Sequence, residues 1–442
     1  MHPYVYRELQ IGALQAFRTV IPASADRIPV TWQTAPSMIL HHLPLVFMAY
    51  LVRRPDTYII RLLLLPTVLS AILRMTFSFH WTDPQLNVYN WGLSLLGLYE
   101  IGRALDFAFA RHGRLKVGEK VPGEMYRRPT PPSHATNAGA HTNGDAHIED
   151  KLEPKDHTSS LFPLWLEDAI EMLCAVRGIG WDFGHGVYVP KEWRSTERTK
   201  FLLQTLKSFA IHFFLLDFQE SLLKLVPGVG SPFGGTIFLP LPLYQRYALS
   251  TAIHILTGSC ILSGFIMVYD LLTLIDVGLL RHSPLSWPPI VENPWGTHSL
   301  HEFWAKRWHQ ILRQTFMVYG GIPGKWIAGN PGMVVGMFLA SGMYHEYAID
   351  TMGRGLDHRV TFFFCLQGVM MFLERFWRKF TGKRVEGWPG TIWVYFVIMV
   401  LGQPCVDAWH LRGLAGGMVI FPVISPTRLV IFPAVRHILN AL

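Results

Sequence analysis

The chain has 442 residues, of which 50% are hydrophobic and 16% are charged, and its formal net charge is +8. Soluble globular proteins have about 25% charged residues, so this composition, with a mean hydropathy of +0.24, excludes an ordinary soluble domain. A chain of this length can hold several spans of about 20 apolar residues. The sequence predicts an all-α fold, a polytopic transmembrane helix bundle.

Apolar runs long enough to cross a bilayer recur along the chain. We predict eight transmembrane helices, at residues 37–52, 58–77, 88–110, 201–218, 247–280, 333–349, 360–377 and 392–409. A ninth run at 415–432 is interrupted by Pro422 and Pro426, so the bundle has eight or nine spans. Glu100, Arg103 and Asp106 share a helical register in the third run, and we expect them to face protein or water.

The distribution of Lys and Arg indicates the orientation of the bundle. The loops after the first, fifth and seventh spans hold more basic residues than the loops after the second, fourth and sixth. Cytoplasmic loops carry this excess, so we predict a lumenal N-terminus and a cytoplasmic loop at 281–332. The first 36 residues lack the pattern of a cleaved signal peptide. The net positive charge suits anionic membrane lipids, and no nucleic-acid partner is expected.

A change in composition divides the chain into three parts. Residues 1–110 hold the first membrane spans, residues 111–160 form a flexible cytosolic linker, and residues 161–442 form a C-terminal core. The linker is rich in Pro, Asn, Gly and His, and such a segment buries too little apolar surface to offset the entropy of ordering. The four cysteines lack ligand-like spacing, so we predict neither a disulfide nor a metal site.

The core begins with an amphipathic pattern at 162–176, typical of a helix that lies along a membrane surface. It ends in the sequence Arg177-Gly178-Ile179-Gly180-Trp181. Arg177 could grip a phosphate-bearing ligand, although an arginine at a helix end more commonly meets lipid headgroups.

A charged aromatic segment, His301-Glu302-Phe303-Trp304-Ala305-Lys306-Arg307-Trp308-His309, lies between long apolar runs. We predict one helix continuing to Thr315, with His301, Trp304 and Trp308 on one side and Lys306 and Arg313 turned outward. A helix at the membrane interface with a belt of tryptophans would give the same pattern without any ligand.

His345 lies within the apolar run at 333–349, beside Tyr344, Glu346 and Tyr347. A neutral imidazole can accept a proton near physiological pH, as deprotonation of an alcohol requires. The alternative is a core histidine that forms hydrogen bonds between helices.

These motifs together resemble a known family. The block Phe303-Trp304-x-x-Arg307-Trp308-His309, followed by His345 in an apolar helix and preceded by Arg177-Gly178-x-x-Trp181, resembles the wax-synthase branch of the membrane-bound O-acyltransferases. The similarity covers approximately residues 161–409. Within that branch the chain looks most similar to fungal enzymes that acetylate hydroxyls of terpenoids and meroterpenoids.

The resemblance implies roles for individual residues. His345 would be the general base on the acceptor hydroxyl. His309, where some relatives have Asn, would polarise the thioester carbonyl, orient acyl-CoA or brace the helix. The other predicted substrate-binding residues are Trp304, Lys306, Arg307, Trp308, Arg313, Arg177, Trp181 and Glu346.

The function implied is an acyl-CoA-dependent O-acyltransferase of the endoplasmic reticulum. It would transfer an acetyl group from acetyl-CoA directly to an apolar alcohol that enters from lipid, without a bound cofactor or metal. A long-chain wax ester or sterol ester synthase using the same residues is one alternative. A transporter-like helix bundle, with His345 and Glu346 as a proton relay, is another.

Overall fold

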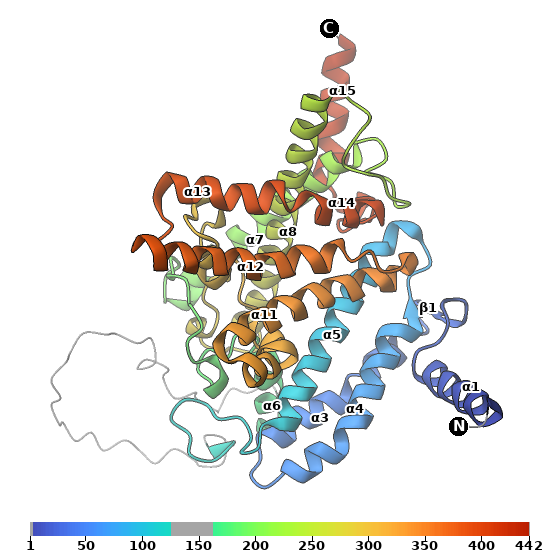
Figure 1. Cartoon of the computed structure of the whole chain (residues 1–442), viewed down its shortest axis with the longest axis vertical. Helices are drawn as coiled ribbons and strands as arrows, with labels where there is room; N and C mark the ends of the chain where they lie inside the picture. The colour runs from blue at the N-terminus through green and yellow to red at the C-terminus, as the bar shows by residue number, and fades with distance from the viewer. Residues whose placement is uncertain (1–2, 125–161, 442) are drawn as a thin grey trace, which may run out of the picture.

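The structure is a computed structural model that describes residues 3–124 and 162–441 (Figure 1). The described residues are predominantly helical, which confirms the predicted all-α class. Two strands, β1 (Ile28–Pro29) and β2 (Phe79–His80), form a short parallel pair. The α-helices are α1 (Pro3–Val20), α2 (Ala35–Leu40), α3 (Leu43–Val52), α4 (Tyr58–Ser78), α5 (Asn87–Phe109), α6 (Leu164–Cys174), α7 (Arg198–Lys224), α8 (Leu243–Gly278), α9 (Leu300–Glu302), α10 (Arg313–Phe316), α11 (Ile322–Ile349), α12 (Arg359–Thr381), α13 (Gly387–Tyr395), α14 (Gln403–Leu411) and α15 (Phe432–Ala441).

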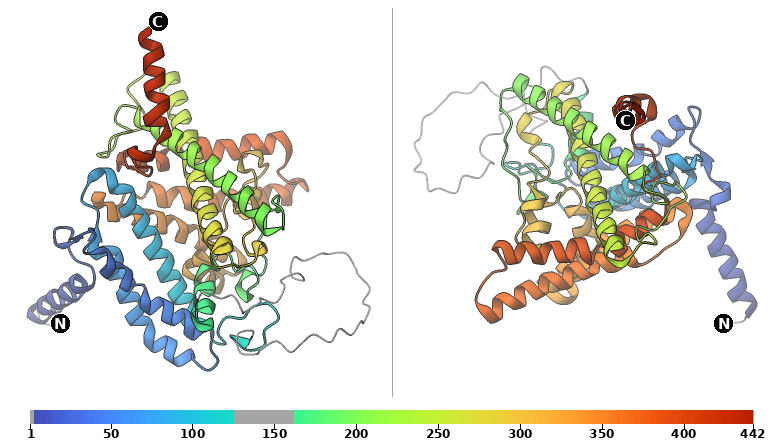
Figure 2. Two further views of the ribbon diagram at one scale, coloured as in Figure 1. Left: turned by 180° about the vertical axis from the view of Figure 1, so that it is seen from behind. Right: turned by 90° about the horizontal axis from the view of Figure 1, so that it is seen from above.

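The helices form a tilted bundle. Helices α11, α12 and the pair α13 and α14 lie side by side, and α5 packs against both α11 and α4 (Figure 1). Helices α7 and α8 pack against each other and face the viewer when the molecule is turned around (Figure 2). Helices α1 and α15 project away from the body at the two ends of the chain (Figures 1 and 2).

Six helical segments among the described residues are long and apolar enough to cross a membrane. They correspond to the first, second, fourth, fifth, seventh and eighth predicted spans, and are Ala35–Val52, Tyr58–Ser78, Arg198–Lys224, Leu243–Gly278, Arg359–Thr381 and Gly387–Leu411. The third and sixth predicted spans are also helical, as α5 and the second half of α11. The chain is therefore a membrane protein.

The charged residues of α5 are buried by protein, as the sequence predicts. Arg103 donates to the carbonyl of Met172, and Asp106 pairs with Arg114. Glu100 accepts a hydrogen bond from His42 at 2.8 Å. These partners explain how a helix with three ionisable residues can lie inside an apolar bundle.

The ninth predicted span, at 415–432, is wrong. This segment consists of turns, a 3-10 turn at Pro422–Ile424 and a π-helical stretch at Thr427–Ile431 that continues into α15. Proline removes a backbone donor and its ring clashes with the preceding turn. Pro422 and Pro426 therefore prevent a continuous helix here.

A helical hairpin lies in the region that we expected to be a loop before residue 333. Helix α10, a π-helical turn at Met317–Gly321 and the start of α11 run to a sharp reversal at Ala328 and Gly329, after which α11 returns. A Cβ atom on Gly320 would lie 2.0 Å from the carbonyl oxygen of Gly336. Only glycine permits this backbone contact, so the small residues fix the close approach of the two arms.

The loops gather on two opposite faces, as the predicted alternation requires. On the face predicted to be lumenal, Arg27 donates to the carbonyl of Thr351, and Asn87 donates to the carbonyl of Arg412. On the face predicted to be cytosolic, His282 contacts Glu167 and the loop carrying Arg194 contacts the chain near 287. Each of these contacts joins loops that were predicted to lie on the same side of the membrane.

The first part of the predicted linker is packed onto the body. Arg53 forms an ion pair with Glu119 and donates to the carbonyl of Arg114, and Lys116 forms a β-bridge with Trp181. Residues 111–124 therefore belong to the folded body and not to a flexible linker. Residues 125–160 of the predicted linker lie outside the described residues.

Candidate active site

The charged aromatic segment is not one continuous helix, contrary to our prediction. Helix α9 passes into a π-helical turn at Phe303–Arg307, and Trp308 is extended, with φ −83° and ψ 153°. The side-chain amide of Gln310 donates to the carbonyls of Trp304 and Trp308, at 2.7 and 3.1 Å. It thus satisfies carbonyls that the interrupted helix leaves without partners.

The break allows His309 to turn into the bundle. Its ring packs against Phe265 of α8, with ring centroids 4.6 Å apart. His345, on α11, stacks on Phe364 of α12 at 4.7 Å with an angle of 13° between the planes. Trp304, in the same segment as His309, contacts Phe364 with ring centroids 6.1 Å apart, so this segment meets the ring on which His345 stacks.

Both histidines lie inside the bundle without being completely buried. Each ring is enclosed by protein, yet each keeps part of its surface accessible. The Nδ1 atom of each ring is buried and has no hydrogen-bond partner in the described structure. A buried polar atom without a partner is unfavourable, and such atoms are expected where a ligand or water completes the site.

The environment of His309 favours its neutral form. Burial lowers the pKa of His309 to about 4, so the ring is uncharged at physiological pH. A neutral imidazole can accept a proton or donate its N–H to a developing negative charge. Either action would serve a reaction at a carbonyl group held beside it.

Aromatic residues surround His345. Besides Phe364, the rings of Trp91, Trp304, Phe363 and Trp409 pack on a common core of aliphatic and sulfur-containing side chains. We call these five residues the aromatic cluster. The sequence did not single out Trp91, Phe363, Phe364 or Trp409, because aromatic residues inside apolar runs have the same pattern as ordinary core residues.

The predicted interface tryptophans lie inside the bundle. Trp304 donates its indole N–H to Gln367 at 3.3 Å, and Trp308 stacks on Phe303 at 5.6 Å. Both contact a second core cluster that contains Leu300 and Phe303. Trp304 thus links this second cluster to the aromatic cluster at His345.

Arg177 is buried and bonded to other parts of the protein. Its side chain is only 4% exposed. It donates to the carbonyls of Pro288 and Pro289 and to the hydroxyl of Tyr269. Trp181 is also buried, and the guanidinium of Arg53 lies over its ring at 4.7 Å. Both residues therefore hold the fold together.

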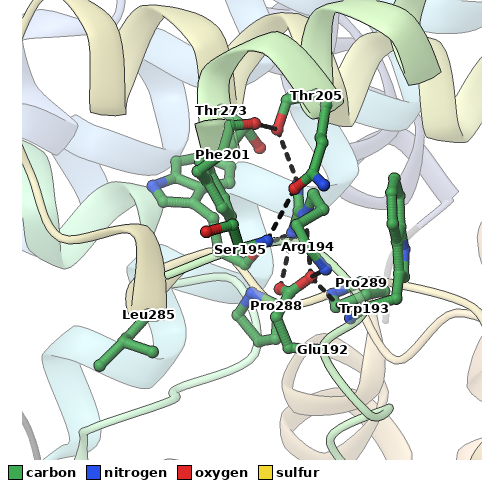
Figure 3. A network of polar contacts seen from close by, with 12 residues as sticks. Glu192, Trp193, Arg194, Ser195, Phe201, Thr205, Thr273, Leu285, Pro288 and Pro289 are labelled. Carbon is green, nitrogen blue, oxygen red and sulfur yellow. Dashed lines mark hydrogen bonds and ion pairs between the residues drawn. The ribbon is translucent and has the colours of Figure 1, made fainter. Parts of the chain in front are cut away.

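A second buried arginine holds the same stretch of chain. Arg194 lies between Glu192 and Thr205 (Figure 3), and it also donates to the carbonyl of Trp287. Three consecutive carbonyls, from residue 287 to residue 289, thus accept from two buried guanidinium groups. We call residues 287–289 the strap.

Helix α8 connects the strap to His309. Tyr269, which bonds Arg177, lies one helical turn after Phe265, which packs on His309. A small cavity of about 70 Å³ lies beside the strap and is lined by Arg177, Trp181 and Tyr269, among others. The motif around Arg177 therefore supports the wall behind His309.

The three predicted phosphate-binding cations differ in their partners. Arg307 pairs with Glu302 at 2.8 Å and with Glu292 at 3.2 Å, so its charge is already compensated. Lys306 is exposed and lies over the ring of Tyr188 at 5.6 Å. Arg313 is half-buried, and no hydrogen bond or ion pair holds its guanidinium within the described chain. Lys306 and Arg313 are thus better placed than Arg307 to bind an anion.

Glu346 also has a different environment from the one predicted. It is buried, and its carboxylate accepts backbone N–H groups of Asp357 and Thr361. These contacts fasten α11 to the start of α12, so its carboxylate already accepts two hydrogen bonds from the protein. Among the described residues, no group of three His, Cys, Asp or Glu side chains is arranged to hold a metal ion.

The segment that carries this site is similar to a known protein family. Residues 287–366 match the membrane bound O-acyl transferase family. That segment contains the strap, His309, the hairpin and His345. The predicted resemblance is confirmed.

Several fungal acetyltransferases are similar to the chain. Acetyltransferase ataH of Aspergillus terreus is 32% identical over 156 residues, which cover 33% of this chain and 51% of the relative. Acetyltransferase ple2 of Rhodocybe pseudopiperita is 24% identical over 211 residues, covering 45% and 52%. Acetyltransferase sirH of Emericella nidulans is 25% identical over 185 residues, covering 40% and 42%. The chain thus spans about half the length of the relatives it matches, and no solved structure matches it significantly.

Proposed function

We propose that the chain is an acyl-CoA-dependent O-acyltransferase that acetylates a hydroxyl of a terpenoid or meroterpenoid. The observation that carries this proposal is the pair His309 and His345, whose buried Nδ1 atoms have no hydrogen-bond partner among the described residues and which lie within the segment that matches the acyltransferase family. The acetyltransferase relatives support acetyl-CoA as the donor.

His345 is the general base in this proposal. Its free ring nitrogen takes the proton of the acceptor hydroxyl while the oxygen attacks the thioester carbonyl carbon. The carbon–sulfur bond then breaks, and the imidazolium returns the proton to the CoA thiolate. Transfer is direct, so no covalent acyl-enzyme forms. The apolar surroundings of His345 keep out water that would hydrolyse the thioester.

His309 and the cations beside it serve the donor in this proposal. The neutral imidazole of His309 is suited to donate a hydrogen bond to the thioester oxygen as negative charge develops there. Lys306 and Arg313 attract the phosphates of CoA from the predicted cytosolic face. The acceptor reaches His345 from the lipid phase. We place the acyltransferase core at residues 161–442 and the protein in the endoplasmic reticulum.

The test is an assay of purified protein with acetyl-CoA and a panel of hydroxylated terpenoids, measuring CoA release and the acetylated product. His345→Ala should lower kcat by about 10²- to 10⁴-fold, the usual contribution of a general base. His212→Ala, which removes a histidine of α7 outside this site, is the matched control and should retain activity.

The same assay tests whether the donor is acetyl-CoA or a long-chain acyl-CoA, and whether the protein is an acyltransferase. Turnover of palmitoyl-CoA with fatty alcohols, but not of acetyl-CoA, would identify a long-chain ester synthase instead. Near-normal turnover by His345→Ala would exclude His345 as the base. Absence of CoA release with every alcohol would refute the proposed function as a whole.

A further inference from the structure

Two indole groups near His345 lack hydrogen-bond partners. The Nε1 atoms of Trp91 and Trp409 are buried, and neither has an acceptor in the described structure. Other indoles of the bundle do have acceptors: Trp304 donates to Gln367, and Trp393 donates to Glu374. Among the described residues, Trp91 and Trp409 are the tryptophans whose buried indole N–H has no acceptor.

Trp409 lies close to the proposed base, and Trp91 packs on the same core cluster as Phe364, on which His345 stacks. The ring of Trp409, on α14, is 6.4 Å from the ring of His345. Trp91 lies on α5, one turn before Leu95, whose carbonyl accepts the hydroxyl of Tyr344 at 2.6 Å. Because Tyr344 precedes His345, this bond fixes α5 beside the base. Trp91 and Trp409 also keep part of their surface accessible, as His345 does.

An unpartnered indole N–H inside an apolar bundle needs an explanation. Burial of a donor without an acceptor is unfavourable, and tryptophans that are buried usually find a partner for the N–H. An indole N–H donates and does not accept, so its missing partner must carry an oxygen or nitrogen lone pair. The flat apolar faces of the cluster suit a polycyclic hydrocarbon skeleton.

We propose that Trp91 and Trp409 position the acceptor by donating hydrogen bonds to oxygen atoms other than the hydroxyl that is acetylated. This inference rests on the proposed function and narrows its substrate class. The acceptor is an apolar polycyclic alcohol that carries at least one further oxygen, such as a ketone, an ether or a second hydroxyl. A fatty alcohol has a single oxygen atom, which belongs to the hydroxyl that His345 deprotonates. It therefore offers no acceptor to either indole N–H.

Replacement of each tryptophan by phenylalanine tests the inference, because it removes the N–H and keeps an aromatic ring. The probes are steroid and terpenoid alcohols in pairs that share one skeleton, with and without a ketone remote from the reacting hydroxyl. For each pair that the wild type acetylates, kcat/KM is measured for both members. Trp326→Phe is the matched control, since Trp326 is 81% exposed.

The expected result is a selective loss. Trp91→Phe or Trp409→Phe should reduce the preference for the ketone-bearing member by about 3- to 10-fold, the range of one neutral hydrogen bond. In these two variants, kcat/KM for the ketone-free member and the KM for acetyl-CoA should stay unchanged. Trp326→Phe should keep the wild-type kcat/KM for both members of each pair. The ratio of the two substrates in one preparation does not depend on the fraction of folded protein, so a destabilised variant remains informative.

Other outcomes overturn the inference. If both variants keep the wild-type preference, ordered water and not the acceptor satisfies the indoles. Equal kcat/KM values of the wild type for the ketone-free and the ketone-bearing member of each pair would also contradict the inference. Both results leave the acetyltransferase activity intact. If no alcohol is acetylated at all, the proposed function fails, and the assignment of the two indoles fails with it.

Discussion

Replacement of Arg177 by alanine separates a structural role from a role in donor binding. In the structure this guanidinium donates three hydrogen bonds, to Pro288, Pro289 and Tyr269, and its side chain is 4% exposed. The sequence alone indicated instead an arginine that meets phosphates or lipid headgroups. The two interpretations predict different effects on stability and on the KM for acetyl-CoA.

The magnitude follows from the bonds that are lost. A hydrogen bond from a charged group contributes about 1.5–3 kcal/mol, and neighbouring bonds are not fully additive, so we expect a loss of about 3–5 kcal/mol. The unfolding entropy is about 2.1 cal/mol/K per residue, or about 0.9 kcal/mol/K for 442 residues. The apparent Tm should therefore fall by about 3–5 °C.

The assay combines thermal unfolding in detergent with steady-state kinetics. We expect Arg177→Ala to lower Tm and kcat, because the strap loosens behind His309, while the KM for acetyl-CoA changes less than twofold. Arg194→Ala, which frees the carbonyl of Trp287, should behave similarly. A variant of Arg177 with wild-type Tm and a KM for acetyl-CoA raised tenfold would refute this reasoning.

Two further predictions concern charged groups outside the spans. Arg313→Gln should raise the KM for acetyl-CoA about 3- to 10-fold with little change in Tm, because its guanidinium has no partner to lose; an unchanged KM would remove it from the donor site. Hydrogen bonds from Arg359 and Arg412 hold the pKa of Asp357 well below its usual range. A carboxylate whose pKa is depressed in the folded state stabilises the protein at pH values above its unfolded pKa of about 3.9. This stabilisation is lost progressively as the pH falls from about 3.9 through the folded-state pKa. Asp357→Asn should therefore lower Tm at pH 7, and its difference from the wild type should shrink towards pH 3; a constant difference would contradict the assignment.

Much of the bundle could be predicted from composition, because a span needs a long apolar run and little else. Six predicted spans meet the same criteria in the structure, and α5 forms despite three ionisable residues. The hairpin before residue 333 was not predicted, since its first arm is short and rich in glycine. A signal was nevertheless present: Gly320 and Gly324 are four residues apart, as are Gly332 and Gly336, a spacing typical of closely packed membrane helices.

The partners of arginines were less predictable than the helices. Arg177, Arg307 and Arg313 all occur beside aromatic residues near the predicted cytosolic face. Only the fold reveals that Arg177 binds carbonyls of the strap and that Arg307 pairs with two carboxylates, whereas Arg313 has neither kind of partner among residues 3–124 and 162–441. These contacts join residues far apart in the chain, and periodicity carries no information about them.

The break in the helix after Arg307 explains how one short motif can place His309 inside the bundle and Lys306 at the surface. In the continuous helix that we predicted, His309 would lie four residues from both Ala305 and Arg313, and would share the face that carries the cation. The extended conformation of Trp308 removes that constraint and lets His309 pack on Phe265. Gln310 stabilises the break by binding the carbonyls that it exposes. The π-helical turn and Gln310 are thus what place a neutral imidazole beside His345 while Lys306 remains at the surface.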